Sequence, residues 1–139
     1  MPESCTHLYV HFVWATWDRA PAVSPAMEQP IHACIADECL QLRCRCVAVG
    51  GTEDHVHVLV RLRASVSVAE MAKQMKGSSS HLVNHQVAPD ANFRWQGTYG
   101  AFSVSPDDVD RVVQYINHQR EHHRQGTTLP DWERCMEEG

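Results

Sequence analysis

The chain has 139 residues, a hydrophobic content of 43% and a formal net charge of −5 at pH 7. These values suit one globular domain with a core of its own. The negative charge counts against nucleic-acid binding driven by charge alone, and the longest apolar runs are too short to cross a membrane. No signal-peptide pattern opens the sequence, so a cytoplasmic protein is expected.

The cysteines contain no CxxC pair, which supports neither a zinc knuckle nor a thioredoxin motif. Without a secretion signal, free thiols are the expected state of all six. They are Cys5, Cys34, Cys39, Cys44, Cys46 and Cys135.

Strand and helix patterns alternate along the first half of the chain. Alternating apolar residues predict a strand over 6–16, and Ser24 is the N-cap of a helix that extends to about Leu42. Residues 43–51 and 54–62 predict two further strands. The short turn between them favours an antiparallel hairpin.

The second half repeats the alternation. Ser67 and Glu70 form a capping box for a helix over 65–87, and 92–105 reads as a fourth extended stretch. A last helix, capped by Ser105, is expected to run to residue 124.

The order β-α-β-β-α-β, followed by one more helix, predicts the fold class. It is α+β, a ferredoxin-like (RRM-like) split βαβ sandwich whose helices cover one face of an antiparallel sheet and leave the other open. Residues 1–126 form this domain, and 127–139 form a C-terminal tail.

Two pairs of polar residues stand out within this frame. His55 and His57 share one face of a strand with Leu59, opposite a face of valines, so the two imidazoles stand side by side on the open face. They could share a metal ion or a phosphate, or be solvated histidines of a half-exposed strand. Tyr115 and Gln119, at i and i+4, are neighbours on the last helix, where a plain solvated surface is the alternative.

These segments together resemble a known family. DHVHVLV fits the His-hydrophobe-His motif and YINHQ the Tyr-x-x-x-Gln motif of the single-tyrosine HUH transposases of bacterial insertion sequences, the TnpA type of the IS200-like and REP-associated class. HLYVHFVWATWDR, QMKGSSSHLVN and WQGTYGAFSVS resemble three more of its segments, in the same order. The similarity spans roughly residues 6–125.

The sequence departs from the family pattern at two places. Thr98 stands where a glycine is usual, which affects the expected bulge in that strand. Trp17 and Asp18 stand where many relatives have a basic and an aromatic residue, which weakens the expectation of a DNA contact there.

The resemblance implies a single-stranded DNA transposase that cleaves and rejoins strands at insertion-sequence ends through a 5′-phosphotyrosine. Tyr115 would be the nucleophile. Mg²⁺ or Mn²⁺ would be the cofactor, since mixed nitrogen and oxygen ligation without thiolate suits these ions. The implied metal ligands are His55, His57 and Gln119.

The resemblance also implies partners. These are single-stranded DNA hairpins at the element ends and a second copy of the chain, in a homodimer whose tyrosine helix reaches the histidines of the other subunit. No membrane and no small-molecule cofactor are expected. Trp95 and Tyr99 are candidates for base stacking. Candidate phosphate contacts are Arg61, Arg63, Lys73, Lys76 and Arg94.

Five further histidines are interpreted as surface or packing residues. They are His11, His81, His118, His122 and His123.

Two other functions stay open at this stage. One is a non-enzymatic or domesticated single-stranded nucleic-acid-binding module on the same fold, although the aromatic RNP motif of RRM domains is not found. The other is a metal-dependent hydrolase unrelated to DNA, which would leave the Tyr-x-x-x-Gln spacing unexplained. Metal-dependent covalent capture of DNA would separate transposition from both.

Overall fold

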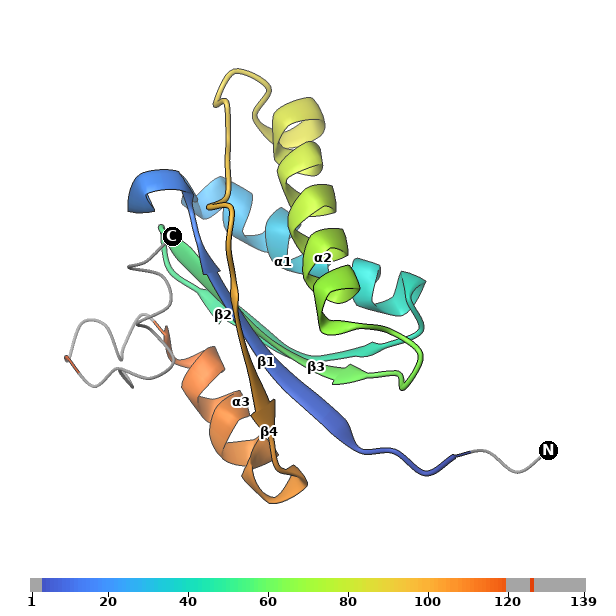
Figure 1. The fold of residues 1–139 in the computed structure, drawn as a ribbon. Coiled ribbons are helices and arrows are strands. Elements are labelled where there is room, and N and C mark those ends of the chain that lie inside the picture. The colour runs from blue at the N-terminus through green and yellow to red at the C-terminus, as the bar shows by residue number, and fades with distance from the viewer. Residues whose placement is uncertain (1–3, 120–125, 127–139) are drawn as a thin grey trace.

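Four strands form one antiparallel sheet in the order β2-β3-β1-β4, as the computed structural model in Figure 1 shows. The structure describes residues 4–119 and residue 126. The strands are β1 (Leu8–Ala15), β2 (Arg45–Gly51), β3 (His55–Leu62) and β4 (Gly100–Val104). The helices are α1 (Pro25–Gln41), α2 (Val68–Leu82) and α3 (Val109–Asn117). This strand order confirms the predicted ferredoxin-like α+β fold.

The main core lies between the sheet and the pair α1 and α2. Alternation along β1 points Phe12 and Trp14 into this core, and the valines of β3 join them from the neighbouring strand. Ile31 and Ile35 of α1 and Met71 and Met75 of α2 fill the layer from the other side.

The helix starts follow the predicted caps. The hydroxyl of Ser67 accepts a hydrogen bond from the Glu70 amide at 3.0 Å, and Ser105 caps the turn before α3 in the same way. The serine-rich centre of α2 is helical, and the buried Ser79 hydroxyl is satisfied within the helix because it donates to the Met75 carbonyl at 2.7 Å.

α3 packs on the opposite face of the sheet, so the prediction of an open face was wrong. Val112 and Ile116 of α3 contact Ala48 and Leu59, and this apolar stripe needs a surface to bury it. α3 ends at Asn117, where a turn follows, and residues 120–124 of the helix predicted to run to residue 124 lie outside the described residues.

The contact between α3 and β2 is close enough to need a glycine. A Cβ atom at Gly50 would collide with the main-chain carbonyl oxygen of Ile116. Gly50 therefore lets the helix backbone rest directly on the strand.

None of the described helices is long and apolar enough to span a bilayer.

Gly50→Ala tests this docking. The added methyl must push α3 away from β2, which we expect to lower the free energy of unfolding by about 1–3 kcal/mol, the usual cost of overpacking. Chemical denaturation measures the change. The matched control is Gly97→Ala, because a Cβ at Gly97 meets nothing within 4 Å. Equal stability of the two variants would contradict the close docking of α3.

Candidate active site

The two predicted histidines lie on the face of β3 that α3 covers. His55 and His57 are 1% and 0% exposed, so they are not solvated strand residues. Two buried imidazoles need polar partners, because an unpaired polar group costs free energy in an apolar surrounding. Each of them has one at its Nδ1 atom.

His57 is held by a third histidine that sequence reasoning had assigned to packing. His11, on β1, is fully buried, and its Nε2 shares a hydrogen bond of 2.8 Å with Nδ1 of His57. With Nδ1 engaged, His57 can offer only Nε2 to a metal ion. The alternation of His11 with Phe12 on β1 already placed it on this face, but its pairing depends on the β1–β3 register.

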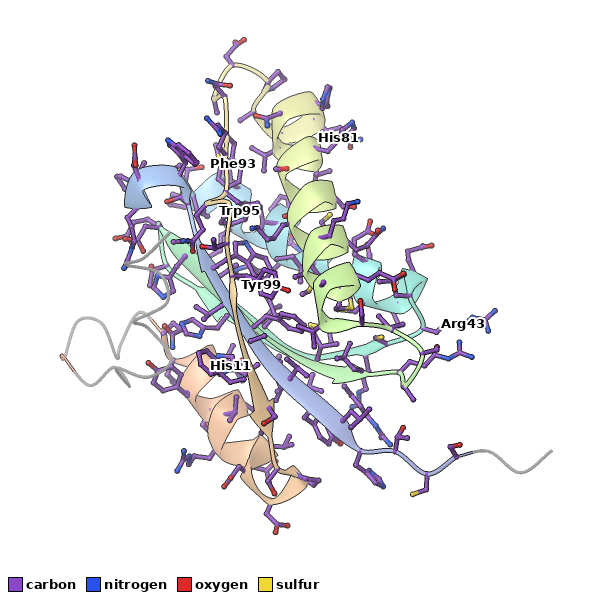
Figure 2. All side chains as sticks on the ribbon, in the orientation of Figure 1. His11, Arg43, His81, Phe93, Trp95 and Tyr99 are labelled. Atoms are coloured by element: carbon purple, nitrogen blue, oxygen red, sulfur yellow. The ribbon has the colours of Figure 1, made fainter. Side chains whose placement is uncertain are left out.

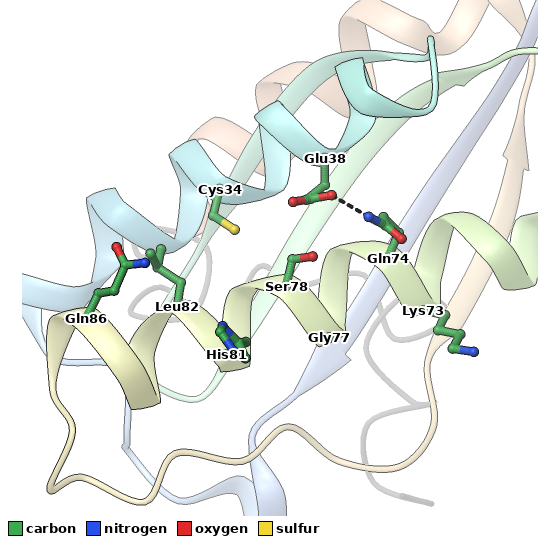
Figure 3. Close-up of a pocket in the computed structure, with 9 residues that line it drawn as sticks. All are labelled: Cys34, Glu38, Lys73, Gln74, Gly77, Ser78, His81, Leu82 and Gln86. Carbon is green, nitrogen blue, oxygen red and sulfur yellow. Dashed lines mark hydrogen bonds between the residues drawn. The ribbon is translucent and has the colours of Figure 1, made fainter.

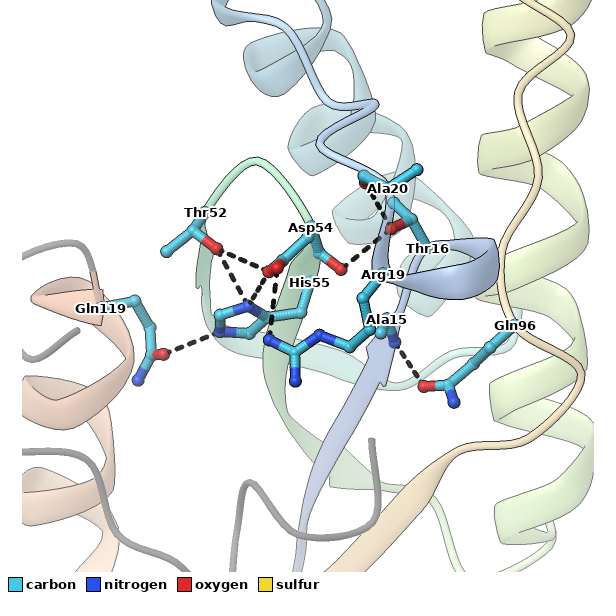
Figure 4. Close-up of polar contacts among 9 residues, drawn as sticks. All are labelled: Ala15, Thr16, Arg19, Ala20, Thr52, Asp54, His55, Gln96 and Gln119. Atoms are coloured by element: carbon cyan, nitrogen blue, oxygen red, sulfur yellow. Dashed lines mark hydrogen bonds and ion pairs between the residues drawn. The ribbon is translucent and has the colours of Figure 1, made fainter. Parts of the chain in front are cut away.

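His55 is held by the loop before β3. Its Nδ1 lies 2.8 Å from Oδ1 of Asp54 and 2.9 Å from the Thr52 hydroxyl (Figure 4). Arg19 approaches the other Asp54 oxygen at 3.3 Å. Burial opposes ionisation of Asp54, but the hydrogen bond with His55 and the charge of Arg19 outweigh it and lower the pKa of the carboxyl to about 2.

α3 brings the other two predicted residues to this pair. The Gln119 Oε1 atom lies 3.1 Å from His55 Nε2, while its Nε2 atom donates to the Tyr115 carbonyl at 3.2 Å. The Tyr115 ring lies edge-on to His57, with 5.7 Å between the ring centroids. All four residues come from one chain, so no second subunit is needed to bring them together.

The donor atoms fit the divalent ion that the sequence implies. A carboxylate only accepts hydrogen bonds, so Nδ1 of His55 donates to Asp54. Its Nε2 and the Gln119 oxygen lie 3.1 Å apart, a separation that either a proton on Nε2 or a cation between the two atoms would bridge. Neighbouring ligands of an octahedral Mg²⁺ ion would be about 3.0 Å apart.

The amide of Gln119 is essential to this donor set. Across residues 4–119, no three His, Cys, Asp or Glu side chains are grouped so that they could hold a metal. Two imidazoles and one amide oxygen would leave further positions open for water and phosphate, as a catalytic rather than a structural site requires.

The five candidate phosphate contacts do not form one patch. Arg61 donates to the Thr6 carbonyl at the far end of β3, Arg63 follows it, and Lys73 is exposed on α2. Lys76 and Arg94 line one pocket, of about 260 Å³.

Two residues expected to touch DNA instead support the fold. Lys76 donates to the carbonyls of Gln96 and Thr98 at 2.8 and 3.0 Å, and burial lowers its pKa. Trp95 is 8% exposed and its indole N–H donates to Ser79, so it cannot offer a free face for stacking. Tyr99 is half-buried against Phe12 (Figure 2).

A separate hollow of about 550 Å³ lies between α1 and α2 (Figure 3). Gln74 donates across it to Glu38 at 2.6 Å. Because the sheet separates these helices from α3, this hollow is not part of the histidine site.

Comparison with solved structures supports the fold. A structure assigned as a transposase from Deinococcus radiodurans R1 superposes with a TM-score of 0.63 and 22% identity, covering 86% of this chain and 98% of that one. A REP-associated tyrosine transposase bound to a REP hairpin superposes with a TM-score of 0.64 and 15% identity, covering 92% and 76%. The fold is thus that of transposase domains.

The family follows from the sequence itself. A family model described as "Transposase IS200 like" matches residues 4–119, and the chain therefore belongs to the IS200-like transposase family. No curated protein matches the chain significantly.

Asp54→Asn tests the electrostatics around His55. The folded-state pKa of Asp54 lies below its ordinary value of 3.8, so its ionised form stabilises the fold above that value and this contribution disappears as the pH falls through about 2. We expect the wild type to exceed the variant by up to about 2 kcal/mol at neutral pH, with the difference shrinking between about pH 4 and 2. Unfolding free energies measured across that range check this. A difference that does not change with pH would contradict it.

Proposed function

We propose that this protein is a transposase that cleaves and rejoins single-stranded DNA, with Tyr115 as the nucleophile and a divalent metal bound by His55, His57 and Gln119. One observation carries the proposal: α3 places Tyr115 beside His57 and Gln119 beside His55 in a single buried cluster. Membership of the IS200-like family supports a role in DNA transposition.

The chemistry follows from these groups. When bound, Mg²⁺ or Mn²⁺ would supply Lewis-acid polarisation of a phosphate oxygen. The Tyr115 oxygen attacks the phosphorus, a 5′-phosphotyrosine bond forms, and the bond to the 3′ oxygen breaks. The proton that the phenol loses is balanced by the one that the departing 3′ oxygen gains. A second 3′-hydroxyl reverses these steps, so rejoining needs no ATP because the phosphotyrosine retains the phosphodiester.

The protein's own residues fix the geometry of this reaction. His11 and Asp54 each hold one histidine by Nδ1, so Nε2 is the nitrogen that each ring would present to the metal. Gln119 also bonds to the Tyr115 carbonyl, so a ligand and the nucleophile are connected directly. A hydrolase that uses water would need no tyrosine at this position.

Hairpin DNA is the substrate class that we propose. The support is the solved REP-associated tyrosine transposase, which is bound to a REP hairpin and shares this fold. A folded single strand offers both unpaired bases and a duplex stem, which a protein can recognise by shape.

Covalent capture of DNA tests the reaction. Purified protein is incubated with single-stranded DNA from the sequence flanking its own gene, with Mn²⁺ or with EDTA, and resolved on a denaturing gel. We expect a shifted protein–DNA band only with metal, and its complete loss in Tyr115→Phe. Tyr99→Phe is the matched control and should keep the band. Binding without any adduct in the wild type would instead favour a non-enzymatic binding module.

A mixture of two inactive variants tests how the site is assembled. The resemblance implies a homodimer with sites shared between subunits, whereas the described geometry supports a site complete in each chain. Tyr115→Phe and His57→Ala should each abolish the adduct, and their mixture should stay inactive if the site forms within one chain. Recovery of adduct on mixing, up to about a quarter of the wild-type amount, would instead support exchange of α3 between subunits.

A further inference from the structure

Trp17 is the one tryptophan that the described structure leaves on the surface. It is 44% exposed, whereas Trp14 and Trp95 are 0% and 8% exposed. An exposed indole leaves a large apolar surface in contact with water, where it does not stabilise the fold by burial. The contacts around Trp17 nevertheless hold it in a defined position on the surface.

The backbone around Trp17 is fixed at both ends. The Trp17 amide donates to the Arg94 carbonyl at 3.0 Å, and the Ala20 amide donates to the Trp17 carbonyl at 3.2 Å. Between them, Asp18 and Arg19 adopt left-handed conformations with φ of 55° and 52°, which non-glycine residues rarely adopt. Such strain is retained where the surrounding structure enforces it, and it concentrates at functional sites.

Arg94 supplies a positive charge directly at the indole. Its guanidinium carbon lies 4.1 Å from the centroid of the Trp17 ring, and its side chain is exposed. Arg94 also borders the pocket of about 260 Å³ that Lys76 and Gly77 line from α2. A cation next to an aromatic ring offers a partner for each part of a nucleotide: the cation for the phosphate and the ring for the base.

The turn that carries Trp17 also contacts the candidate active site. Arg19 pairs with Asp54, which in turn bonds to His55, and the Thr16 amide donates to the Asp54 carbonyl at 2.8 Å (Figure 4). Trp17 therefore lies next to the loop that positions a proposed metal ligand.

We infer that Trp17 and Arg94 form a binding site for one unpaired nucleotide of the DNA strand, with the base stacked on the indole and the phosphate beside the guanidinium. The inference rests on the proposed function and adds a substrate-binding site to it.

Tryptophan fluorescence and DNA affinity test the inference without any cleavage. The probe is a short fluorescent oligothymidylate in EDTA at low ionic strength. Quenching is measured in a Trp132→Phe background, because Trp132 lies outside the described residues. We expect the single strand to quench the emission of Trp17, and Trp17→Ala to weaken binding by roughly 5- to 150-fold, with Trp17→Phe much closer to wild type.

Arg94→Gln is expected to reduce the slope of log affinity against log salt by about 0.7, the value for one phosphate contact on a single strand. Arg43→Asn is the matched control. Arg43 is an exposed arginine in the turn between α1 and β2, and asparagine tolerates its positive φ (Figure 2). It should leave the quenching unchanged and lower the slope less than Arg94→Gln does.

The outcomes separate the two proposals. If Trp17→Ala binds the oligonucleotide as well as wild type does, or a duplex quenches the indole equally, the nucleotide site is refuted, while the Tyr115 adduct still supports the proposed function. If wild type neither binds single strands nor forms the adduct, the proposed function and the nucleotide site fail together.

Discussion

The docking of α3 on the sheet is the interaction on which the candidate site depends. The histidines belong to β3, but the proposed nucleophile and the proposed amide ligand belong to α3 and the turn after it, and the packing of α3 brings the two sets together. Val112 and Ile116 bury an apolar stripe on Ala48 and Leu59, which supplies free energy that polar residues at the site cannot. Gly50 sets how near the helix can come. The polar residues of the candidate site are therefore held in position by an apolar contact next to them.

Both imidazoles are oriented by a hydrogen bond at Nδ1, but the partner differs. Each has its Nδ1 atom engaged, by Asp54 in one case and by His11 in the other, so Nε2 is the nitrogen that each ring could present to a ligand. The partners differ in charge, since Asp54 is ionised and is itself paired with Arg19, whereas a histidine partner brings no fixed charge. Rings that are already held in this way would lower the cost of ordering them if the proposed metal binds.

The sequence predicted what depends on local pattern, and it failed where distant segments meet. Alternation gave the faces of β1 and β3, and serine caps gave the starts of α1 and α2, because both signals are read within a few residues. The coverage of the second sheet face could not be read this way, since it requires knowing where α3 packs. Lys76 and Trp95 resembled DNA contacts in the sequence. The burial of Trp95 and the carbonyls to which Lys76 donates become visible only in the folded chain.

The end of β1 is where catalytic and surface features meet. The main-chain amide of Gln96 donates to the Ala15 carbonyl, and its side-chain oxygen accepts from the Ala15 amide. These two bonds fix the segment that carries Arg94 against β1. One residue later, Thr16 bonds to the loop that holds Asp54. Both connections are short and involve main-chain atoms, so a nucleotide bound at Trp17 would be held in a fixed position relative to His55. A strand anchored there would present its neighbouring phosphates to the metal ligands and Tyr115 with little freedom to slide, which is how binding energy remote from the reacting atoms can be used for positioning.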